Sequence, residues 1–338
     1  MSYPAHRISV APMMDWTDRH DRFFLRLITR RALLYTEMVT TGALKHGDVA
    51  RHLDYDTAEH PVALQLGGSE PDDMADCARL AEQWGYDEVN INVGCPSDRV
   101  QSGAFGACLM REPETVAACV TAMKRAVTIP VTVKCRIGVD EQPEGPALRE
   151  LVRRVRDAGC DGIAVHARKA WLDGLSPKEN RDIPPLNYPL VYAIAAENPG
   201  YPVAINGGIQ SLDEAEAHLE HVTGAMIGRA AYQTPWMLSE IDHRFFGEPD
   251  SGLDRFDVVE AMLPYIERRM AEGLWLGNIT RHMLGLFQGL PGARIWRRHL
   301  SENAHKPDAG IQTVRDAADK VREVLERRET VTAQAIQA

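Results

Sequence analysis

The segment VTVKCRI (residues 131–137), followed by ALRELVRRVRDA (147–158) and GIAVHA (162–167), decides the fold class. Its first and third pieces are short apolar runs, as in buried strands. In the middle piece the apolar residues recur at helical spacing. A strand, a helix and a second strand in this order predict a β/α unit with a parallel sheet.

The same alternation runs through most of the chain. Short apolar runs predict eight strands, at 8–14, 33–39, 62–67, 88–94, 131–137, 162–167, 203–207 and 225–228. Intervening amphipathic stretches predict helices, among them 72–84, 113–127, 147–158 and 213–221. Ser69, and Ser211 with Glu214 at capping-box spacing, are predicted helix starts. Eight such units favour a closed (β/α)8 TIM barrel over an open sheet.

At 338 residues, the chain is longer than the roughly 250 residues of a typical barrel of this class. We therefore expect a barrel over residues 1–246 and a linker rich in Gly, Pro and Asp over 247–255. An all-helical domain is predicted over 256–328, and a polar, disorder-prone tail over 329–338. The helices predicted in the second domain span 256–272, 279–288, 293–302 and 311–328.

Composition excludes several classes of protein. No apolar stretch approaches the roughly 20 residues of a membrane span, and the N-terminus does not resemble a secretory signal. We therefore expect a cytoplasmic protein that does not associate with a membrane. The six cysteines form no C-x-x-C pair, so neither a zinc site nor any other metal is expected. The net charge is −10, so binding to a nucleic acid requires a local basic patch.

Polar residues stand where the predicted strands end, which is where TIM barrels carry their active sites. A contact with a neighbouring loop explains each of these residues better when it is taken alone, but their joint placement in a ring at strand ends favours a ligand with many donors and acceptors. The ring comprises Pro12, Met13, Met14, Glu37, Gln65, Asn90, Asn92, Cys95, Lys134, Arg136, His166, Arg168, Asn206, Gly207, Gly208, Gly228 and Arg229.

Asn206-Gly207-Gly208 and Gly228-Arg229 end the seventh and eighth strands, where barrels commonly bind a phosphate. The alternative is that these glycines only make tight turns. Because no G-x-G-x-x-G follows a strand, flavin mononucleotide (FMN) fits better than a dinucleotide. Lys134 would then stabilise negative charge on the reduced flavin ring, with Gln65 and His166 as hydrogen-bond partners. A Schiff-base lysine of an aldolase is the rival interpretation of Lys134.

Cys95 lies in NVGCPS (residues 92–97), on a loop over the predicted barrel mouth. A thiol is mostly protonated at neutral pH and serves there as a proton donor. A nucleophile and a packed bystander are the other interpretations. The remaining five cysteines are expected to be structural, with Cys135 facing the surrounding helices.

Several long motifs in order resemble the bacterial tRNA-dihydrouridine synthases, and more narrowly their subfamily A, from Val10 to about Glu302. These motifs are APMMDWTDRH (11–20), LYTEM (34–38), HPVALQLGG (60–68), NVGCPS (92–97), VHAR (165–168) and INGG (205–208).

The resemblance implies a reaction and its residues. It implies that reduced FMN passes hydride to C6 of a uracil ring, that Cys95 protonates C5, and that NADPH reduces the flavin again. It assigns FMN to Pro12 to Met14, Gln65, Lys134, His166, Asn206 to Gly208, Gly228 and Arg229. It assigns tRNA to Asn92, Lys178, Arg181, Arg294 and Arg297, with D-loop uridines 20 and 20a as targets.

A helix face supplies the required basic patch. Arg294, Arg297 and Arg298 are three and four residues apart, with Arg281 and Lys306 nearby in sequence. An ordinary solvated helix face is the alternative. An RNA would be recognised mainly by shape and backbone contacts, after its target base is extracted.

Two rival functions remain open. One is a flavin barrel that acts on a free pyrimidine, like a dihydroorotate or dihydropyrimidine dehydrogenase, but it has no use for a basic helical domain. The other is an RNA-binding protein that keeps the barrel as a scaffold, but it needs neither Cys95 nor Lys134. The sequence leaves NADPH against NADH and the oligomeric state open, with a monomer favoured.

Overall fold

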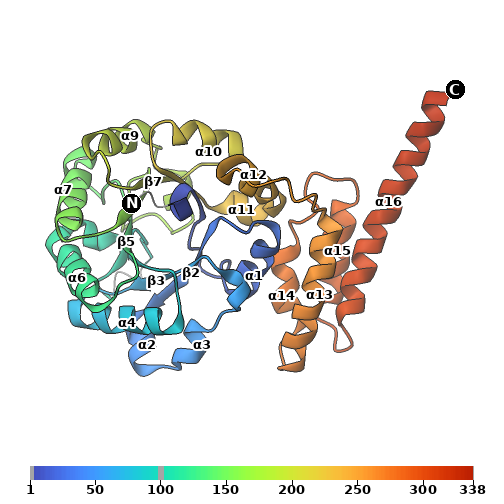
Figure 1. The fold of residues 1–338 in the computed structure, drawn as a ribbon, viewed down its shortest axis with the longest axis horizontal. Coiled ribbons are helices and arrows are strands. Elements are labelled where there is room, and N and C mark those ends of the chain that lie inside the picture. The colour runs from blue at the N-terminus through green and yellow to red at the C-terminus, as the bar shows by residue number, and fades with distance from the viewer. Residues whose placement is uncertain (1–3, 98–102, 338) are drawn as a thin grey trace. The chain divides into compact units, whose positions relative to one another are not determined.

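The computed structural model describes residues 4–97 and 103–337. In that part of the chain, eight parallel strands form a closed barrel, in which sequence neighbours pair and β1 also pairs with β8. The strands are β1 (Ile8–Val10), β2 (Leu33–Thr40), β3 (Val62–Gly67), β4 (Glu88–Val93), β5 (Val131–Arg136), β6 (Gly162–His166), β7 (Val203–Asn206) and β8 (Gly224–Ile227). The predicted TIM barrel is confirmed (Figure 1).

Helices alternate with these strands, as the apolar spacing predicts. They are α2 (Thr41–His46), α3 (Val49–Leu53), α4 (Pro71–Trp84), α6 (Pro113–Ala126), α7 (Glu144–Asp157), α8 (Glu179–Asp182), α9 (Tyr188–Glu197) and α10 (Leu212–Leu219). Short 3₁₀ helices are η1 (Pro4–Arg7), η2 (Thr57–Glu59) and η3 (Gly106–Arg111). In Figure 1, α4, α6, α7, α9 and α10 lie outside the ring of strands.

Two predicted helix starts have different outcomes. Ser211 caps α10, since its side chain accepts a hydrogen bond from the Glu214 N–H. Ser69 does not cap α4, because the N-cap is Glu70 and Pro71 stands at the first helical position. Proline already holds its φ at a helical value, so α4 begins there without a serine cap.

Side chains from the strands pack together inside the barrel. Tyr35 and Met226 are almost fully buried among small side chains that lie on other strands, such as Ala63, Ala164 and Ala204. Large and small side chains in one layer fill the interior of a closed barrel. The strands are therefore buried on both faces, which explains their nearly continuous apolar runs.

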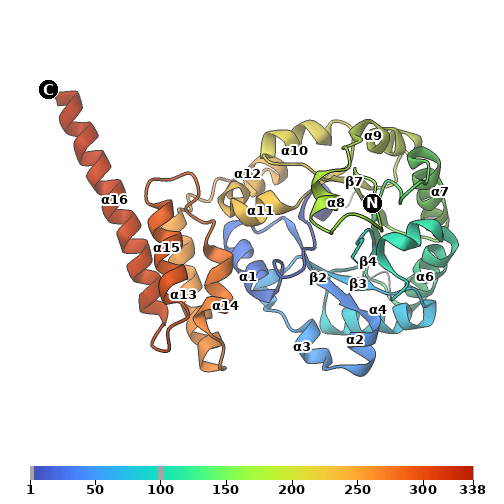
Figure 2. The same cartoon turned by 180° about the vertical axis from the view of Figure 1, so that it is seen from behind.

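Contacts divide the chain into two compact units, Met1–Arg19 with Arg31–Gly228, and His20–Arg30 with Arg229–Ala338. The first unit holds the barrel strands. The helices of the second are α1 (Arg19–Ile28, mostly in this unit), α11 (Arg229–Gln233), η4 (Pro235–Glu240), α12 (Ile241–Phe246), α13 (Arg255–Ala271), α14 (Leu276–Met283), α15 (Ala293–Asn303) and α16 (Ile311–Gln337). The predicted domain boundary after residue 246 stays a prediction. Figure 2 shows α13, α14 and α15 beside the first part of α16.

Helix α1 follows β1 in sequence but belongs by its contacts to the second unit. The rings of Phe23 and Tyr265 stack with centroids 4.0 Å apart, and His20 Nδ1 lies 2.7 Å from the Tyr265 hydroxyl. At the other end of α1, the Thr29 hydroxyl donates to Asp242 Oδ1 over 2.6 Å. These contacts fix α1 against α13 and α12.

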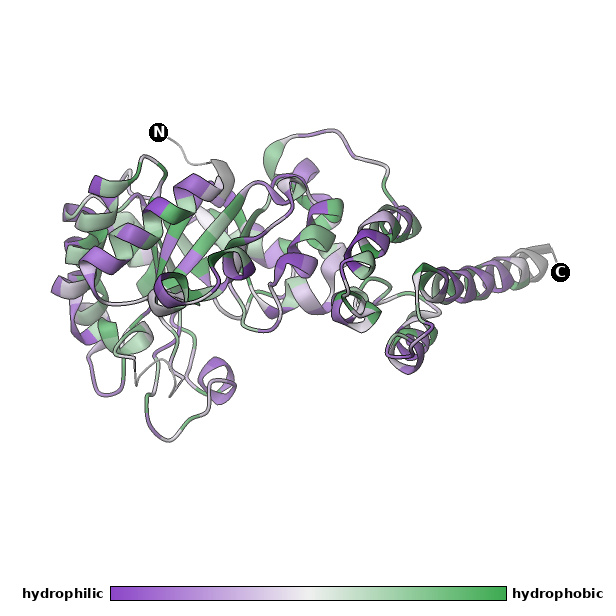
Figure 3. Ribbon diagram, turned by 90° about the horizontal axis from the view of Figure 1, so that it is seen from below, coloured by the Kyte–Doolittle hydropathy of each residue, from purple (hydrophilic) through white to green (hydrophobic). Residues whose placement is uncertain are grey.

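Two helices of the second unit differ from their predicted bounds. Helix α14 ends at Met283, short of the predicted 288, because the chain turns at Gly285. A Cβ added there would lie 2.6 Å from Gln233 O. Helix α16 continues to Gln337, past the predicted end at 328, and its sequence has no Gly or Pro to stop it. In Figure 3 much of α16 before its C-terminal end is coloured as hydrophilic. No described helix is both long and apolar enough to cross a membrane.

Candidate active site

Strand register brings the predicted polar residues together at the C-terminal ends of the strands. In neighbouring strands Gln65 lies opposite Asn90, Asn92 opposite Lys134, Arg136 opposite His166, and His166 opposite Asn206. Residues far apart in sequence thus share one end of the barrel. The prediction of a polar ring there is supported for the residues on β3 to β7.

Two side-chain amides fix the loop that carries Cys95. Gln65 accepts a hydrogen bond from Asn92 Nδ2 over 2.8 Å, and both side chains are buried. Asn92 Oδ1 then accepts from the backbone N–H groups of Gly94 (3.1 Å) and Cys95 (3.0 Å). The Cys95 carbonyl accepts from the Ala107 N–H over 2.9 Å. The loop is therefore held on both sides of the thiol.

Cys95 differs from most of the other cysteines in its surroundings. Its thiol is partly exposed, and its Sγ lies 3.4 Å from Ser97 Oγ. Cys77, Cys119, Cys135 and Cys160 are buried, and burial raises the pKa of the thiols of Cys119 and Cys135 to about 12.

Cys108 is the other partly exposed cysteine. Its thiol donates to Phe105 O over 3.0 Å, and burial raises its pKa. Cys95 is therefore the partly exposed cysteine that lies on the predicted catalytic loop.

Lys134 supplies a cation inside the barrel. Burial first, and the nearby Arg136 guanidinium second, lower the pKa of the Lys134 ammonium to about 8. Within residues 4–97 and 103–337 this ammonium makes no hydrogen bond or ion pair. A partly buried cation is costly without a partner, so Lys134 fits an electron-rich ligand such as a flavin ring.

The neighbouring polar groups have defined roles. The Arg136 guanidinium donates to Asn180 O (2.9 Å) and Gly94 O (3.3 Å), so it ties the α8 segment to the Cys95 loop. Burial, with the charges of Arg136 and Lys134, lowers the pKa of His166 well below its ordinary value. His166 is therefore a neutral hydrogen-bonding group at neutral pH.

The ends of β7 and β8 form a cradle that requires glycine. Gly207 has φ +107°, and a Cβ there would lie 2.4 Å from His166 Cδ2; Gly208 has φ +79°. A Cβ on Gly228 would meet nothing within 4 Å. Asn206 Nδ2 donates to Met226 O over 2.7 Å and so joins β7 to β8. Close backbone approach and open space are what a bound phosphate group needs, so the residues present fit FMN.

Other predicted cofactor residues follow β1 and β8 in sequence. The segment after β1 contains Pro12, Met13 and Met14, and turns through a hydrogen bond from Met13 N to Thr17 Oγ1 of 2.9 Å. The Met14 side chain is 54% exposed and so is accessible to a ligand. Arg229 follows Gly228 directly and is grouped by its contacts with the second unit.

The predicted tRNA residues fall in both units. Asn92 lies in the barrel site. Lys178 directly precedes α8 and Arg181 lies within it, and both side chains are exposed. Arg294 and Arg297 are on α15 in the second unit, where Arg297 donates to Gln288 Oε1.

The side chains on the basic face of α15 are not equivalent. Arg298 forms an ion pair with Glu302 of 2.8 Å. Arg294 is exposed and makes no hydrogen bond or ion pair among the described residues. Of the three arginines, Arg294 is therefore the most available for an external anion.

Sequence reasoning missed a buried polar group under the site. Glu88 is 1% exposed and lies on the same strand as Asn90 and Asn92, at every second position. Its carboxylate accepts from Tyr35 of β2 and from Thr132 of the adjacent strand β5. The signal was present in the alternation of polar residues along 88–92, because the interior of a barrel is usually apolar.

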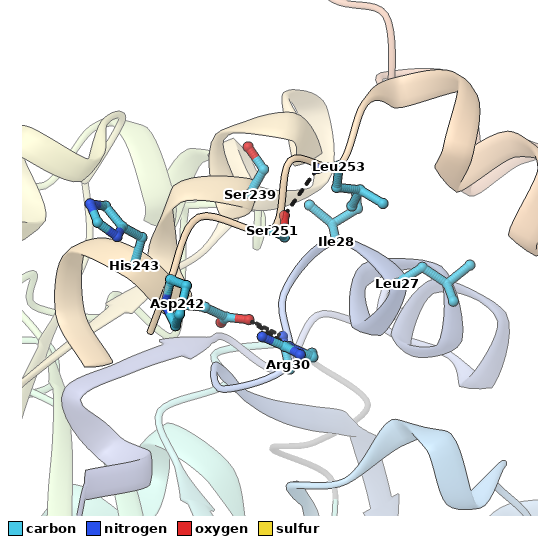
Figure 4. Close-up of a pocket in the computed structure, with 9 residues that line it drawn as sticks. Leu27, Ile28, Arg30, Ser239, Asp242, His243, Ser251 and Leu253 are labelled. Carbon is cyan, nitrogen blue, oxygen red and sulfur yellow. Dashed lines mark hydrogen bonds and ion pairs between the residues drawn. The ribbon is translucent and has the colours of Figure 1, made fainter. Parts of the chain in front are cut away.

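A separate cavity of about 160 Å³ lies within the second unit, and Figure 4 shows Arg30 beside Asp242 in its lining. Arg30 also forms an ion pair with Glu248 of 2.7 Å. None of the predicted site residues lines this cavity. The part of the chain that the structure describes holds no group of three His, Cys, Asp or Glu residues suited to a metal ion.

Comparison with known proteins places the chain in a family. The model of the dihydrouridine synthase (Dus) family matches residues 9–322. A tRNA-dihydrouridine(20/20a) synthase of Vibrio parahaemolyticus is 58% identical over 316 residues, 93% of this chain and 97% of that protein. One from Escherichia coli is 60% identical over 316 residues, 93% of this chain and 95% of that protein.

A solved structure shares the fold at low identity. It is 2-naphthoyl-CoA reductase in complex with 2-naphthoyl-CoA, with a TM-score of 0.53 and 11% identity, over 70% of this chain and 49% of that one. The family match and the close relatives both span nearly the whole chain. This chain belongs to the dihydrouridine synthase family and is a flavin-dependent oxidoreductase.

Proposed function

We propose that this enzyme reduces the C5=C6 bond of uridines 20 and 20a in the D-loop of tRNA, with FMN as its cofactor and NADPH as reductant. Support for the substrate comes from the relatives, which are named for these two positions and cover the chain almost end to end. Support for the chemistry comes from the barrel mouth.

One arrangement carries the proposal. Lys134, a cation without a partner in the described part of the chain, lies on the strand next to Asn92, and Asn92 holds the backbone of Cys95. An electron-rich ring beside Lys134 and a thiol on the adjacent loop are the two parts that such a reduction needs. Bound FMN, when reduced, supplies the hydride for C6 of the uracil.

The side chains of this enzyme perform the remaining tasks. Cys95 holds the proton that C5 receives, on a thiol that is accessible from the loop. Gln65, Lys134 and His166 bind the flavin ring. Its phosphate is bound by Asn206, Gly207 and Gly208, by Gly228 and Arg229, and its remaining contacts come from Pro12 to Met14.

Recognition of the tRNA uses surfaces on both units. Asn92 contacts the target base, Lys178 and Arg181 contact the RNA near the barrel mouth, and Arg294 with Arg297 bind its backbone. A D-loop uridine is held within the fold of the tRNA, so it must be extracted before it is reduced. The net charge of −10 repels RNA elsewhere, which restricts binding to these cations.

Two anaerobic half-reactions test the proposal. The purified protein is first reconstituted with FMN and reduced with NADPH, which should bleach the flavin spectrum. Unmodified tRNA is then added, and the spectrum should return in step with one dihydrouridine formed per flavin. Mass spectrometry of nuclease fragments would locate the product at positions 20 and 20a.

Each failure points elsewhere. Reduced flavin that is reoxidised by free uracil or uridine, but not by tRNA, would favour an enzyme of free pyrimidines. Binding of tRNA without any reoxidation would favour an RNA-binding role. Reoxidation with dihydrouridine at other positions would refute only the assignment to 20 and 20a.

A further inference from the structure

A continuous chain of buried polar side chains runs inside the barrel, from the first residue of β4 to the loop that carries Cys95. Its members on β4 are Glu88, Asn90 and Asn92, with exposed fractions of 1%, 0% and 8%. Gln65 of β3 and Thr132 of β5 bridge them from either side. Buried polar groups are costly unless each donor meets an acceptor. Here the hydrogen bonds all point the same way along the chain, toward Glu88.

The chain begins at a group that can only accept. The Glu88 carboxylate receives hydrogen bonds from the Tyr35 hydroxyl (2.7 Å), the Thr132 hydroxyl and His6 Nε2 (2.5 Å). Burial lowers the pKa of His6, but attraction and hydrogen bonding to Glu88 outweigh it, so the pKa is raised and the ring nitrogen stays a donor. A carboxylate with three donors around it has no proton to give.

Each following group is then oriented by the one before it. Thr132 has one hydroxyl proton, which it gives to Glu88, so its oxygen accepts from Asn90 Nδ2 over 2.8 Å. Asn90 therefore presents its oxygen to Gln65 Nε2, also over 2.8 Å. Gln65 in turn presents its oxygen to Asn92 Nδ2.

The last step reaches the catalytic loop. With its nitrogen directed at Gln65, Asn92 has its oxygen toward the N–H groups of Gly94 and Cys95, and accepts from both. A reversed chain would direct the Asn92 NH₂ at two N–H donors. That arrangement makes no hydrogen bond and would displace the Cys95 backbone.

We propose that Glu88 and Thr132 are positioning residues, which set the amide orientations of Gln65 and Asn92 and thereby the place of the Cys95 thiol. This inference rests on the proposed function, in which Gln65 binds FMN and Cys95 is the proton donor. Neither Glu88 nor Thr132 needs to touch substrate or cofactor, since both act through the amides above them.

Two substitutions at one position separate orientation from packing. Thr132→Val keeps the shape of the side chain and removes the hydroxyl, whereas Thr132→Ser keeps the hydroxyl and removes a methyl group. Both are made with Cys108→Ser, so that Cys95 is the remaining cysteine that is not buried. The readouts are the alkylation rate of Cys95 by iodoacetamide in the apoprotein, the flavin spectrum of the holoenzyme, and reoxidation of reduced flavin by unmodified tRNA.

The expected pattern differs between the two variants. Thr132→Val should change the alkylation rate severalfold, shift the flavin spectrum, and slow single-turnover reoxidation about tenfold, with KM for tRNA within twofold of the parent. Thr132→Ser should stay within about twofold in every readout, even if it loses more thermal stability, because a hydroxyl rescues the direction of the chain.

A second pair decides the matter if Thr132→Val does not fold. Glu88→Gln introduces an NH₂ that lets the chain reverse, and should slow reoxidation to a similar degree. Tyr35→Phe removes one donor to Glu88 without introducing a donor that could reverse the chain, and should react like the parent. Parent-like alkylation and reoxidation in Thr132→Val or in Glu88→Gln would overturn the inference. A parent enzyme that tRNA cannot reoxidise would instead refute the proposed function.

Discussion

Cys95 is tied into its loop by backbone hydrogen bonds on both sides, so its side chain can be changed without releasing the loop. We expect Cys95→Ala to bind FMN and tRNA normally and to reoxidise flavin at least about a hundredfold more slowly, because a general acid is lost. Anaerobic stopped-flow with unmodified tRNA measures this rate. Cys108→Ser is the matched control, and an unchanged rate in Cys95→Ala would remove the thiol from its role.

The charge of Lys134 predicts that FMN binding depends on pH. Its pKa of about 8 lies below the ordinary lysine value, so the ammonium is charged below pH 8 and loses its proton as the pH rises through 8. The affinity of the apoprotein for FMN should be constant below pH 8 and fall by up to about tenfold per pH unit above it. Quenching of FMN fluorescence from pH 6.5 to 9.5 measures this change.

A substitution at the same position provides the control for that titration. Lys134→Met should bind FMN more weakly at every pH and show no fall above pH 8. A profile in Lys134→Met that parallels the unsubstituted enzyme would assign the titration to another group.

At the scale of residues, the sequence predicted the polar side chains at the barrel mouth better than the buried hydrogen-bond network beneath them. Gln65, Asn92, Lys134 and His166 share one end of the barrel because strand ends follow from apolar runs. The network that begins at Glu88 was missed, since it depends on which side chains of different strands meet, and that is decided by register.

The turn after β7 carries a prediction about one element. Gly207→Ala would combine an unfavourable positive φ with a Cβ 2.4 Å from the His166 ring, whereas Gly200→Ala has a φ of +82° with nothing within 4 Å. Backbone strain alone costs about 1 kcal/mol. Gly207→Ala should therefore lose more stability and most of its FMN, while Gly200→Ala loses about 1 kcal/mol and keeps FMN. Thermal unfolding and flavin content measure both effects, and equal losses would refute the cradle.

Helix α15 carries the prediction for RNA. Arg294→Ala with Arg297→Ala should weaken tRNA binding and reduce the salt dependence of log K by about 2, since two phosphate contacts are lost. The flavin spectrum should not change. Arg298→Ala should have a smaller effect, because Glu302 already neutralises that charge. Filter binding of tRNA at salt concentrations from about 50 to 200 mM would test this. Unaltered affinity in the double variant would rule out the basic face.

At the scale of elements, seven strands were predicted to within one residue at each end, but the first was predicted over 8–14 and ends at Val10. Helix ends were predicted less well. Helix α14 stops early because Gly285 packs against the backbone of Gln233, a tertiary contact without a local signal. Helix α16 continues because nothing in its sequence ends it. The sequence also did not predict that α1 belongs to the second unit, because the sequence of a β/α unit does not indicate which neighbouring element its helix will contact.

At the scale of the whole molecule, the contacts of α1 predict the effect of removing the C-terminal helices. Phe23 and His20 are buried or nearly buried, and both contact Tyr265 of α13. A chain ending at residue 246 would expose these side chains, so it should bind a hydrophobic dye and unfold at a lower temperature than the full chain. A truncated protein with the same melting temperature and full FMN content would show that residues 1–246 fold without the second predicted domain.

Closure of the barrel by β1 and β8 has a consequence for synthesis on the ribosome. Ile8 pairs with Ala225, so the first strand lacks one of its two neighbours until more than two hundred further residues have been added. At ordinary elongation rates of about 5 to 20 residues per second this interval is on the order of 10 to 40 s. Throughout it the nascent chain presents an open strand edge at each end of a growing sheet, which is a binding site for chaperones and a site of aggregation. Variants that slow closure should therefore lower the yield of soluble protein in the cell before they alter the finished enzyme.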